Sequence, residues 1–294
     1  MAMTGTRVAV DWRRAQLALR AEVERVTRLL RSGLDPNAPA LGEWTVAGVA
    51  THLSQAWLAV PGLAKQDLSE VYDVIPSAEE VAGHHLIRNV WELADLTRLG
   101  VRSDPVQDLS VLADRIEARS AAYFAAMGGD ANDLRGWLVE GTEVPVATLT
   151  CHLLNETIVH GWDIAHASGR PWPIEPSHAA LVIEGFIIPI FQALEPREMV
   201  DQKAAAGVRA TYEFRLRDGQ RYVWAFDNGA LTVEGPRSGR AKGIDCHISA
   251  DAAAMLLVAW GRQSQWPAIA SGKITAWGRK PWLGPKFRSL VRNP

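Results

Sequence analysis

The amino-acid sequence predicts a helical bundle followed by a small α+β domain. Up to about residue 170, apolar residues recur at helical spacing over long stretches, and the connections between them contain Pro or Gly, which is typical of an up-and-down bundle. After about residue 207, apolar and polar residues alternate and turn sequences interrupt the alternation, which indicates paired strands. We therefore expect a bundle over residues 1–203 and an α+β domain over residues 204–294.

Five helices are predicted in the first part. The first covers residues 11–31, and the second begins after Thr45, whose hydroxyl suits an N-cap, and ends at Pro61-Gly62. The third covers about residues 77–99 and opens with the capping-box sequence "SAEE". The last two cover about residues 105–127 and 146–168.

Strands dominate the second part. The stretch "VRATYEFRLRDGQRYVWAF" alternates, turns at Asp218-Gly219 and alternates again, which predicts a hairpin. Two further strands are expected in "ALTVEG" and "IDCHIS", and "GKITAWG" is expected to complete the sheet. The stretch "ADAAAMLLVAWGR" between them is apolar and predicts a helix.

The composition predicts a globular protein of the cytoplasm. Hydrophobic residues make up 48% and charged residues 22% of the chain, and the net charge of -2 gives no reason to expect a nucleic-acid partner. The two cysteines, Cys151 and Cys246, are far apart in the sequence and provide neither a disulfide framework nor a cysteine-rich metal site. The N-terminal segment lacks the apolar core of a signal peptide, and no apolar run reaches the roughly 18 residues of a membrane span. We expect no membrane partner.

Charge is unevenly distributed along the chain. Residues 252–294 hold seven basic and no acidic residues, whereas residues 1–251 hold 24 basic and 33 acidic ones. Two interpretations remain open. The basic segment packs on an acidic body, or it forms a cationic entrance that attracts an anionic substrate.

The fifth predicted helix carries an ionisable side chain at every fourth position, namely His152, Glu156 and His160. Residues four apart lie on one helix face, so Glu156 can share a metal ion with either histidine. The two histidines are about 12 Å apart along the axis at 1.5 Å per residue, too far to bind one ion together. The spacing predicts a pair of ligands, either His152 with Glu156 or Glu156 with His160.

His52 is the candidate for a third ligand, because it lies among apolar residues in the middle of the second predicted helix. Two histidines and one carboxylate leave a coordination position open, as in catalytic rather than structural zinc sites. Zinc is the expected metal, although the same ligands suit ferrous iron or nickel.

At these residues the sequence resembles the mycothiol-dependent maleylpyruvate isomerase family, which belongs to the DinB-like superfamily of metal-binding four-helix bundles. The similar segments are "EWTVAGVATHLSQA" and "LLNETIVHGWDIAHASGRPW". Members of this family often carry a C-terminal domain similar to sterol carrier proteins, and "GKITAWGRKPWLGPKF" looks like the end of one. Gly161 is a departure, because many relatives have arginine after the ligand histidine. The segment between Ile174 and Gly207 is also longer than expected.

The resemblance implies an enzyme and assigns its residues. It places the metal ligands at His52, Glu156 and His160, and it suggests Arg262 as an arginine of the C-terminal domain near the thiol. It also implies mycothiol or a similar thiol as cosubstrate and a small electrophilic molecule as second substrate. The metal would hold the thiol as thiolate, which would attack the electrophile, giving an isomerase or an S-transferase.

Residues near the ligand positions have further expected roles. Asp163 is expected either to orient His160 or to favour a helix surface, and Trp57 and Trp162 are expected to wall the metal pocket. His152 is interpreted as a core histidine bonded to a backbone carbonyl rather than as a proton relay, and His84-His85 as surface residues.

Two other functions are compatible with the sequence. The protein could bind an apolar ligand in its C-terminal domain without catalysis, or it could be a metal hydrolase whose metal activates water. The hydrolase would need a general base, for which Asp163 and His152 are the candidates.

Overall fold

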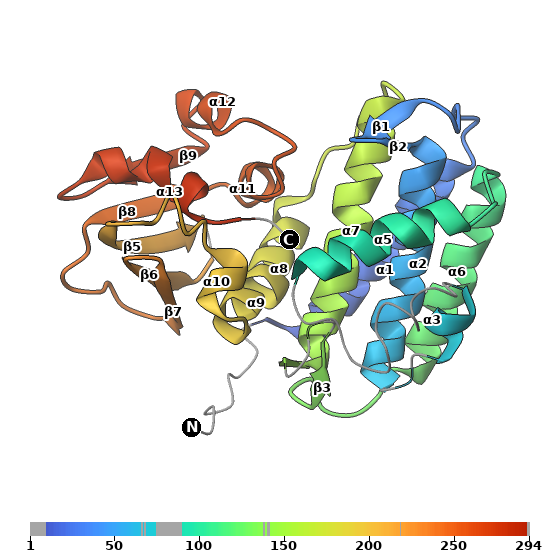
Figure 1. Ribbon diagram of the computed structural model, residues 1–294, viewed down its shortest axis with the longest axis horizontal. Coiled ribbons are helices and arrows are strands. Elements are labelled where there is room, and N and C mark those ends of the chain that lie inside the picture. Colours follow the sequence, from blue (N-terminus) through green and yellow to red (C-terminus); the bar gives the residue numbers. More distant parts are fainter. Residues whose placement is uncertain are drawn as a thin grey trace. The chain divides into compact units, whose positions relative to one another are not determined.

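The computed structural model describes residues 10–65, 67, 69–74, 90–137, 139, 142–217 and 219–292, and it divides into two compact units (Figure 1). The units are Met1–Ile174 and Glu175–Pro294. This division lies earlier than the boundary expected at residues 203 and 204. The reason is that the segment after residue 175 is attached to the sheet, because Gln192 donates hydrogen bonds to the carbonyl oxygens of Val233 and Gly235.

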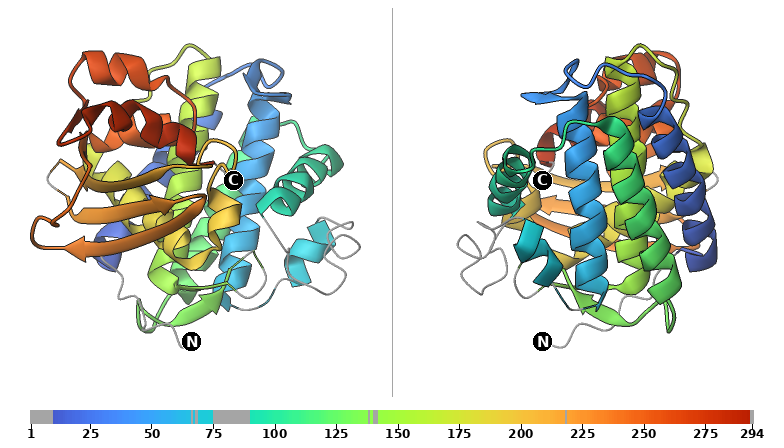
Figure 2. Two further views of the ribbon diagram at one scale, coloured as in Figure 1. Left: turned by 60° about the vertical axis from the view of Figure 1, so that its left-hand side comes forward. Right: turned by 90° about the vertical axis from the view of Figure 1, so that its right-hand side faces the viewer.

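Four long helices make up the bundle of the first unit, and they lie side by side in the right-hand view of Figure 2. They are α1 (Trp12–Leu30), α2 (Val46–Lys65), α6 (Leu109–Ala126) and α7 (Val146–Ala167). Helix α7 packs against α1 and α2, and α6 packs against the same two helices. Two shorter helices of this unit, α3 (Ser69–Val74) and α5 (Val90–Ser103), both contact α2. The predicted bundle is confirmed.

Side-chain caps fix where these helices begin. Asp11 accepts a hydrogen bond from the first turn of α1, and Asp108 does the same for α6. Thr45 accepts from the backbone N–H of Gly48, as predicted for the start of α2. Helix α7 has almost no exposed face, since nearly all residues from Val146 to Ala165 are buried. The ionisable stripe therefore lies inside the bundle.

Several details of the first unit differ from the sequence predictions. Helix α2 does not end at Pro61 but continues to Lys65, although proline deprives the helix of one backbone hydrogen bond. Two short ribbons were not predicted, β1 (Pro39–Leu41) with β2 (Trp44–Thr45) and β3 (Leu134–Gly136) with β4 (Glu143–Pro145). Each leads directly into a ligand-bearing helix. The start of the third predicted helix, with His84-His85, lies outside the described residues.

The second unit is built on a five-stranded sheet of order β7-β6-β5-β8-β9. All neighbouring strands are antiparallel except β5 and β8, which are parallel. The strands are β5 (Arg209–Leu216), β6 (Arg221–Asp227), β7 (Ala230–Arg237), β8 (Cys246–Ala250) and β9 (Ile274–Trp277). These are the strands that the alternation predicts, and the turn residue Asp218 lies outside the described residues.

Helices cover one face of this sheet. The chain enters the unit through α8 (Pro176–Val182), the π-helix η1 (Ile183–Ile187), α9 (Ile188–Ala193) and α10 (Pro196–Met199). After β8 it forms α11 (Ala252–Ala259) and α12 (Gln265–Ala270), and after β9 the 3-10 helix η2 (Pro281–Leu283) and α13 (Gly284–Leu290). The ring of Phe287 in α13 packs against Tyr212, Phe214, Trp224 and Phe226 of the sheet. This aromatic cluster is the core of the unit.

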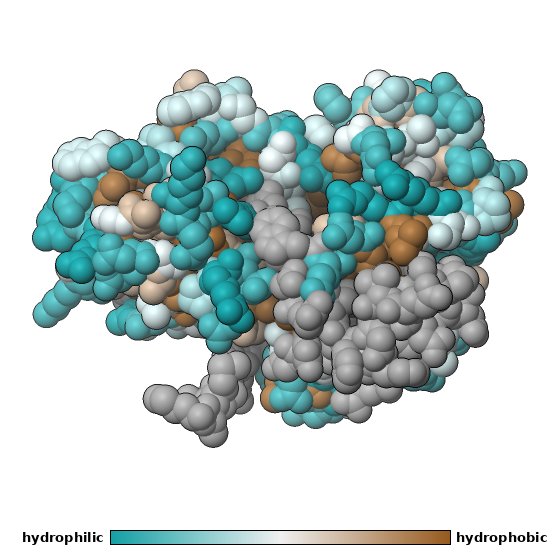
Figure 3. Space-filling model, viewed as in Figure 1, coloured by the Kyte–Doolittle hydropathy of each residue, from teal (hydrophilic) through white to brown (hydrophobic). Residues whose placement is uncertain are grey.

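One stretch of the described chain, Pro176–Ala193, is long and apolar enough to cross a membrane by length and composition, contrary to the sequence expectation. Its mean hydropathy is 1.2, and 44% of it is buried inside the structure. A buried core helix passes the same test, so this is weak evidence for a membrane span. On the face shown in Figure 3, hydrophilic residues cover most of the coloured surface and hydrophobic residues appear in separate patches.

Candidate metal centre

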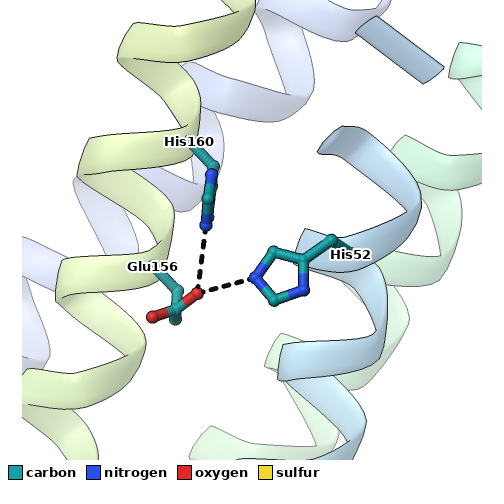
Figure 4. Close-up of side chains that lie close together, drawn as sticks. All are labelled: His52, Glu156 and His160. Carbon is teal, nitrogen blue, oxygen red and sulfur yellow. Dashed lines mark hydrogen bonds and ion pairs between the residues drawn. The ribbon is translucent and has the colours of Figure 1, made fainter. Parts of the chain in front are cut away.

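Three side chains from two helices converge inside the bundle (Figure 4). Glu156 and His160 lie one turn apart on α7, and His52 projects from α2 toward them. The Oε2 atom of Glu156 lies 3.0 Å from Nε2 of His52 and 3.3 Å from Nε2 of His160. One candidate ligand atom from each residue lies within 4.8 Å of the other two. Of the two pairs that the spacing allows, Glu156 with His160 is therefore the one that His52 joins.

This arrangement suits a divalent cation. Zinc binds nitrogen and carboxylate oxygen at about 2.0–2.2 Å, so tetrahedral ligand atoms lie about 3.4 Å apart. The separations from the Glu156 oxygen to the two imidazole nitrogens are close to this value. Two imidazoles and a carboxylate are also a donor set that zinc, ferrous iron and nickel accept. The residues present fit a metal, with at least one coordination position left for another ligand.

Burial and hydrogen bonding set the charges of the three groups. Burial by itself would raise the pKa of the Glu156 carboxyl, but hydrogen bonds from the three neighbouring histidines outweigh burial and hold that pKa well below its usual value. Burial lowers the pKa of His52, more than its hydrogen bond with Glu156 raises it. The site thus combines an anionic carboxylate with an imidazole kept neutral, which is the form that binds metals.

Asp163 fixes the orientation of His160. Its Oδ2 atom lies 3.0 Å from Nδ1 of the imidazole, and Asp163 is only 2% exposed. Burial alone would lower the pKa of His160, but the hydrogen bonds with Asp163 and Glu156 raise it to about 9. Because Asp163 occupies Nδ1, the other ring nitrogen is directed toward Glu156. Such a carboxylate partner orients a ligand histidine and makes it more basic.

Asp163→Asn is expected to weaken zinc binding by about 10- to 100-fold, the usual effect of losing a partner of a ligand histidine. Asparagine keeps the size of the side chain but loses the charge that holds the imidazole. Competition with a chromogenic chelator measures the affinity. Asp114→Asn, which alters an exposed carboxylate of the same bundle, is the control and should change nothing. An unchanged affinity in the Asp163 variant would assign this carboxylate to packing alone.

The second oxygen of Glu156 has partners that were not expected. Asn155 donates a hydrogen bond to Oε1 over 3.2 Å, and Nε2 of His152 lies 3.5 Å from the same oxygen. Trp137 donates its indole N–H to Nδ1 of His152 over 3.5 Å. His152 thus has side-chain neighbours at both ring nitrogens, and its interpretation as a core histidine bonded to a backbone carbonyl stays a prediction. The sequence signal that could have identified Asn155 is its position directly before the Glu156 carboxylate.

The aromatic residues around the ligands differ in their contacts. Trp57 is 1% exposed, and its ring packs against Tyr123 and Phe124 of α6. Trp162 stacks on His166 near the end of α7. Trp44, which the sequence analysis did not single out, has its ring 5.2 Å from that of His52. Trp44 thus has a ring contact with a ligand of the converging set, and a role of Trp57 and Trp162 in the metal pocket stays a prediction.

Packing explains the glycine at position 161. A Cβ atom at this position would clash with the ring of Trp172. The guanidinium of Arg25 also packs on the Trp172 ring, 3.7 Å from its centroid. Glycine therefore allows Trp172 to pack against α7 immediately after the ligand histidine, where many members of the resembled family have arginine.

Arg262 lies after α11 in the second unit, where its Nη1 atom donates a hydrogen bond to the carbonyl oxygen of Trp260 over 2.9 Å. Its expected place near the thiol stays a prediction.

Comparison with known proteins finds a family model for part of the C-terminal unit and several similar solved structures. The SCP-2 sterol transfer family matches residues 191–278. No curated protein matches the chain. Among solved structures, a mycothiol-dependent maleylpyruvate isomerase is similar over 91% of this chain and 93% of its own, with 12% identity and a TM-score of 0.48.

Two other solved structures are similar to smaller parts of the chain. The ubiquinone synthesis protein UbiJ-SCP2 is 18% identical over 30% of this chain and 72% of its own, with a TM-score of 0.23. The stereoselective inverting sec-alkylsulfatase Pisa1 from Pseudomonas sp. is 16% identical over 49% of this chain and 27% of its own, with a TM-score of 0.29. The family model at residues 191–278 agrees with the sterol-carrier-like C-terminal domain that the sequence predicts.

Proposed function

We propose that this protein is a divalent-metal-dependent enzyme that uses mycothiol or a similar thiol to attack an electrophilic small molecule. The convergence of His52, Glu156 and His160 on one point carries this proposal. These residues would hold the metal, most readily zinc. A thiol has a pKa of about 8.5 in water, and coordination to a divalent cation deprotonates it. The cation would thus supply a thiolate at neutral pH.

The chain's own residues prepare this chemistry. The buried carboxylate of Glu156 supplies the negative charge that a cation needs, and Asp163 keeps the imidazole of His160 in place. The bundle core around α7 excludes bulk water from the ligands, since both α7 ligands are less than 10% exposed. The guanidinium of Arg262 is proposed to lie near the thiol and to face an anionic substrate.

Two outcomes of the thiolate attack are possible. The sulfur forms a bond to one carbon of an activated double bond, and the electron pair of that bond moves to the neighbouring carbon. If the substrate is a cis-enedioic acid such as maleylpyruvate, the remaining single bond rotates, the C–S bond breaks, and the trans isomer and the thiol are released. With an electrophile that carries a leaving group, the thioether remains. The first outcome is an isomerase and the second an S-transferase.

His160→Ala tests this function. We expect the wild-type protein to purify with about one divalent metal per chain and the variant to lose it together with turnover of mycothiol with maleylpyruvate or an alkyl halide. Isomerisation regenerates the thiol and transfer consumes it, so following thiol and product together distinguishes the two. His166→Ala, an exposed histidine at the end of the same helix, is the control. Metal and turnover retained in the His160 variant would refute the ligand assignment.

A second function is favoured by the C-terminal unit. We propose that this unit binds an apolar ligand, because it contains an apolar cavity and matches the SCP-2 sterol transfer family. This binding can exist beside the metal-dependent activity or in place of it. The hydrolase gains no support, because both candidate bases are engaged: Asp163 lies against His160, and His152 lies against Glu156 and Trp137.

A further inference from the structure

The face of the five-stranded sheet opposite the aromatic cluster carries charged side chains. Phe214 of β5 stacks on Phe287 of α13, and successive residues of a strand point to opposite faces of the sheet. Glu213 and Arg215 of β5 therefore lie on the other face. Arg221 of β6 lies there too, because its Nη1 atom donates a hydrogen bond to Oε1 of Glu213 over 3.0 Å. We call the face that carries these three residues the charged face.

Strand pairing places three arginines in one row across the sheet. Arg215 of β5 is the partner of Arg221 of β6, and Arg221 is the partner of Arg237 of β7. On its other side, Arg215 is the partner of Ser249 of β8. Neighbouring strands lie roughly 4.8 Å apart, and like charges directly opposite one another destabilise a sheet. Each of these arginines therefore needs a counter-charge.

Two of the three arginines have a counter-charge within the unit. Arg221 pairs with Glu213, and Nη1 of Arg237 lies 3.4 Å from Oε2 of Glu234. Arg215 differs from both. Among the residues that the structure describes, no carboxylate forms an ion pair with Arg215, and its Nε atom is buried without a hydrogen-bond acceptor. A buried donor without an acceptor costs free energy, which an oxyanion bound to this guanidinium can offset.

Glu213, two residues from Arg215 on the charged face, is engaged on both carboxylate oxygens. Its Oε1 atom accepts from Arg221 and lies 3.0 Å from Nδ1 of His247, and its Oε2 atom accepts from the backbone N–H of Ala241 over 3.0 Å. Burial alone would raise the pKa of Glu213, but the hydrogen bonds from Ala241 and His247 hold it below its usual value. This carboxylate is thus ionised and shared among other partners, and it leaves Arg215 without a counter-charge.

The loop between β7 and β8 adds positive charge and limits the size of a ligand. Its Ala241 N–H anchors the loop over Glu213, and the exposed Arg240 and Lys242 flank this anchor. Neither cation forms an ion pair within the described part of the chain. Ser249, the partner of Arg215 in β8, is only 6% exposed. The charged face therefore suits a compact anionic group rather than a flat surface such as a bilayer.

We propose that Arg215, with Arg221 beside it, binds the phosphate group of a small soluble phosphate monoester on the charged face of the C-terminal unit. Such a phosphate carries up to two negative charges at neutral pH and three strong acceptor oxygens, which match the planar donor forks of two guanidinium groups. A carboxylate brings a single charge for the two cations. The site shares no residue with the metal centre or with the lining of the apolar cavity, so it is independent of both proposed functions.

Isothermal titration of the full-length chain with glycerol 3-phosphate and with glycerate tests the proposal, because the two ligands share a three-carbon skeleton and differ in the anionic group. We expect the wild-type protein to bind the phosphate at least about tenfold more tightly, as one additional hydrogen bond to a charged group would give. Arg215→Gln should abolish this preference, and Arg215→Met replaces it if the glutamine variant does not fold. Arg209→Gln is the control and should keep the preference, since Arg209 lies on the same strand but pairs with Asp227.

Four results would overturn the proposed phosphate site. The first two are equal or absent binding of the two ligands by the wild-type protein, and a preference for the phosphate that survives the loss of the Arg215 guanidinium. Each titration is repeated with a chelator present, and a preference that disappears with the chelator would place the phosphate on a metal held by the bundle. Binding to phosphatidylcholine vesicles that contain phosphatidate, without binding of glycerol 3-phosphate, would assign the charged face to a lipid surface instead.

Discussion

Glu156→Gln is expected to abolish metal binding while the bundle stays folded. The Oε2 atom of Glu156 lies within 3.3 Å of both candidate imidazole nitrogens, and Glu156 supplies the anionic donor of the three-residue set. Glutamine keeps the size and the hydrogen-bonding capacity but removes the charge. The loss of affinity should exceed the roughly 10- to 100-fold that removal of a partner outside the ligand set costs.

The thermal unfolding midpoint measures this effect without an activity assay. A bound ion stabilises the folded protein, so zinc should raise the midpoint of the wild-type protein relative to chelator and leave that of the variant unchanged. Glu117→Gln makes the same charge change at an exposed ion pair with Arg31 and should keep the zinc response. A zinc response of wild-type size in the Glu156 variant would contradict the proposed ligand set.

Trp57→Ala is expected to cost about 3–5 kcal/mol of unfolding free energy, the range observed when large aromatic residues are removed from a packed core. Trp57 is 1% exposed and fills the space between α2 and α6, where its ring contacts Tyr123 and Phe124. Alanine would leave a cavity that these rings cannot fill. Urea denaturation of the variant and the wild-type protein gives the difference.

Trp162→Ala is the matched control for this measurement. Trp162 is the other tryptophan close in sequence to a candidate ligand, but it is partly exposed and stacks on the exposed His166. Its removal should cost much less than that of Trp57. Equal losses in the two variants would show that the bundle does not depend on Trp57 as its contacts indicate.

The sequence predicts the helices and strands that are long enough for a pattern of apolar residues to be recognised. Helix α7 shows twenty-two residues of helical pattern, and strands β5 and β6 alternate over seven or eight residues each. The ribbons β1–β2 and β3–β4 have strands of two or three residues, too short to show any period. The local sequence also does not predict that α2 continues past Pro61, because the packing of the helix against its neighbours decides where it ends.

The candidate site shows the same limit. Spacing on one helix restricts the ligands to Glu156 and a histidine four residues away, but His152 and His160 satisfy that rule equally. Only the position of α2 beside α7 decides between them, since it brings the imidazole of His52 toward the His160 side of Glu156. Trp44 and Trp137 could not be assigned because they belong to the short β1–β2 and β3–β4 segments, whose placement beside α2 and α7 no local pattern shows.

The shared oxygen of Glu156 has a consequence for how the two ligand-bearing helices are held together. Two imidazoles from separate helices lie against this oxygen. The carboxylate therefore links α2 to α7 and preorganises the binding geometry. Small zinc domains fold only when their metal is present. Here the large apolar interior around α7 supports the helices independently, and loading the centre should demand little rearrangement of the backbone.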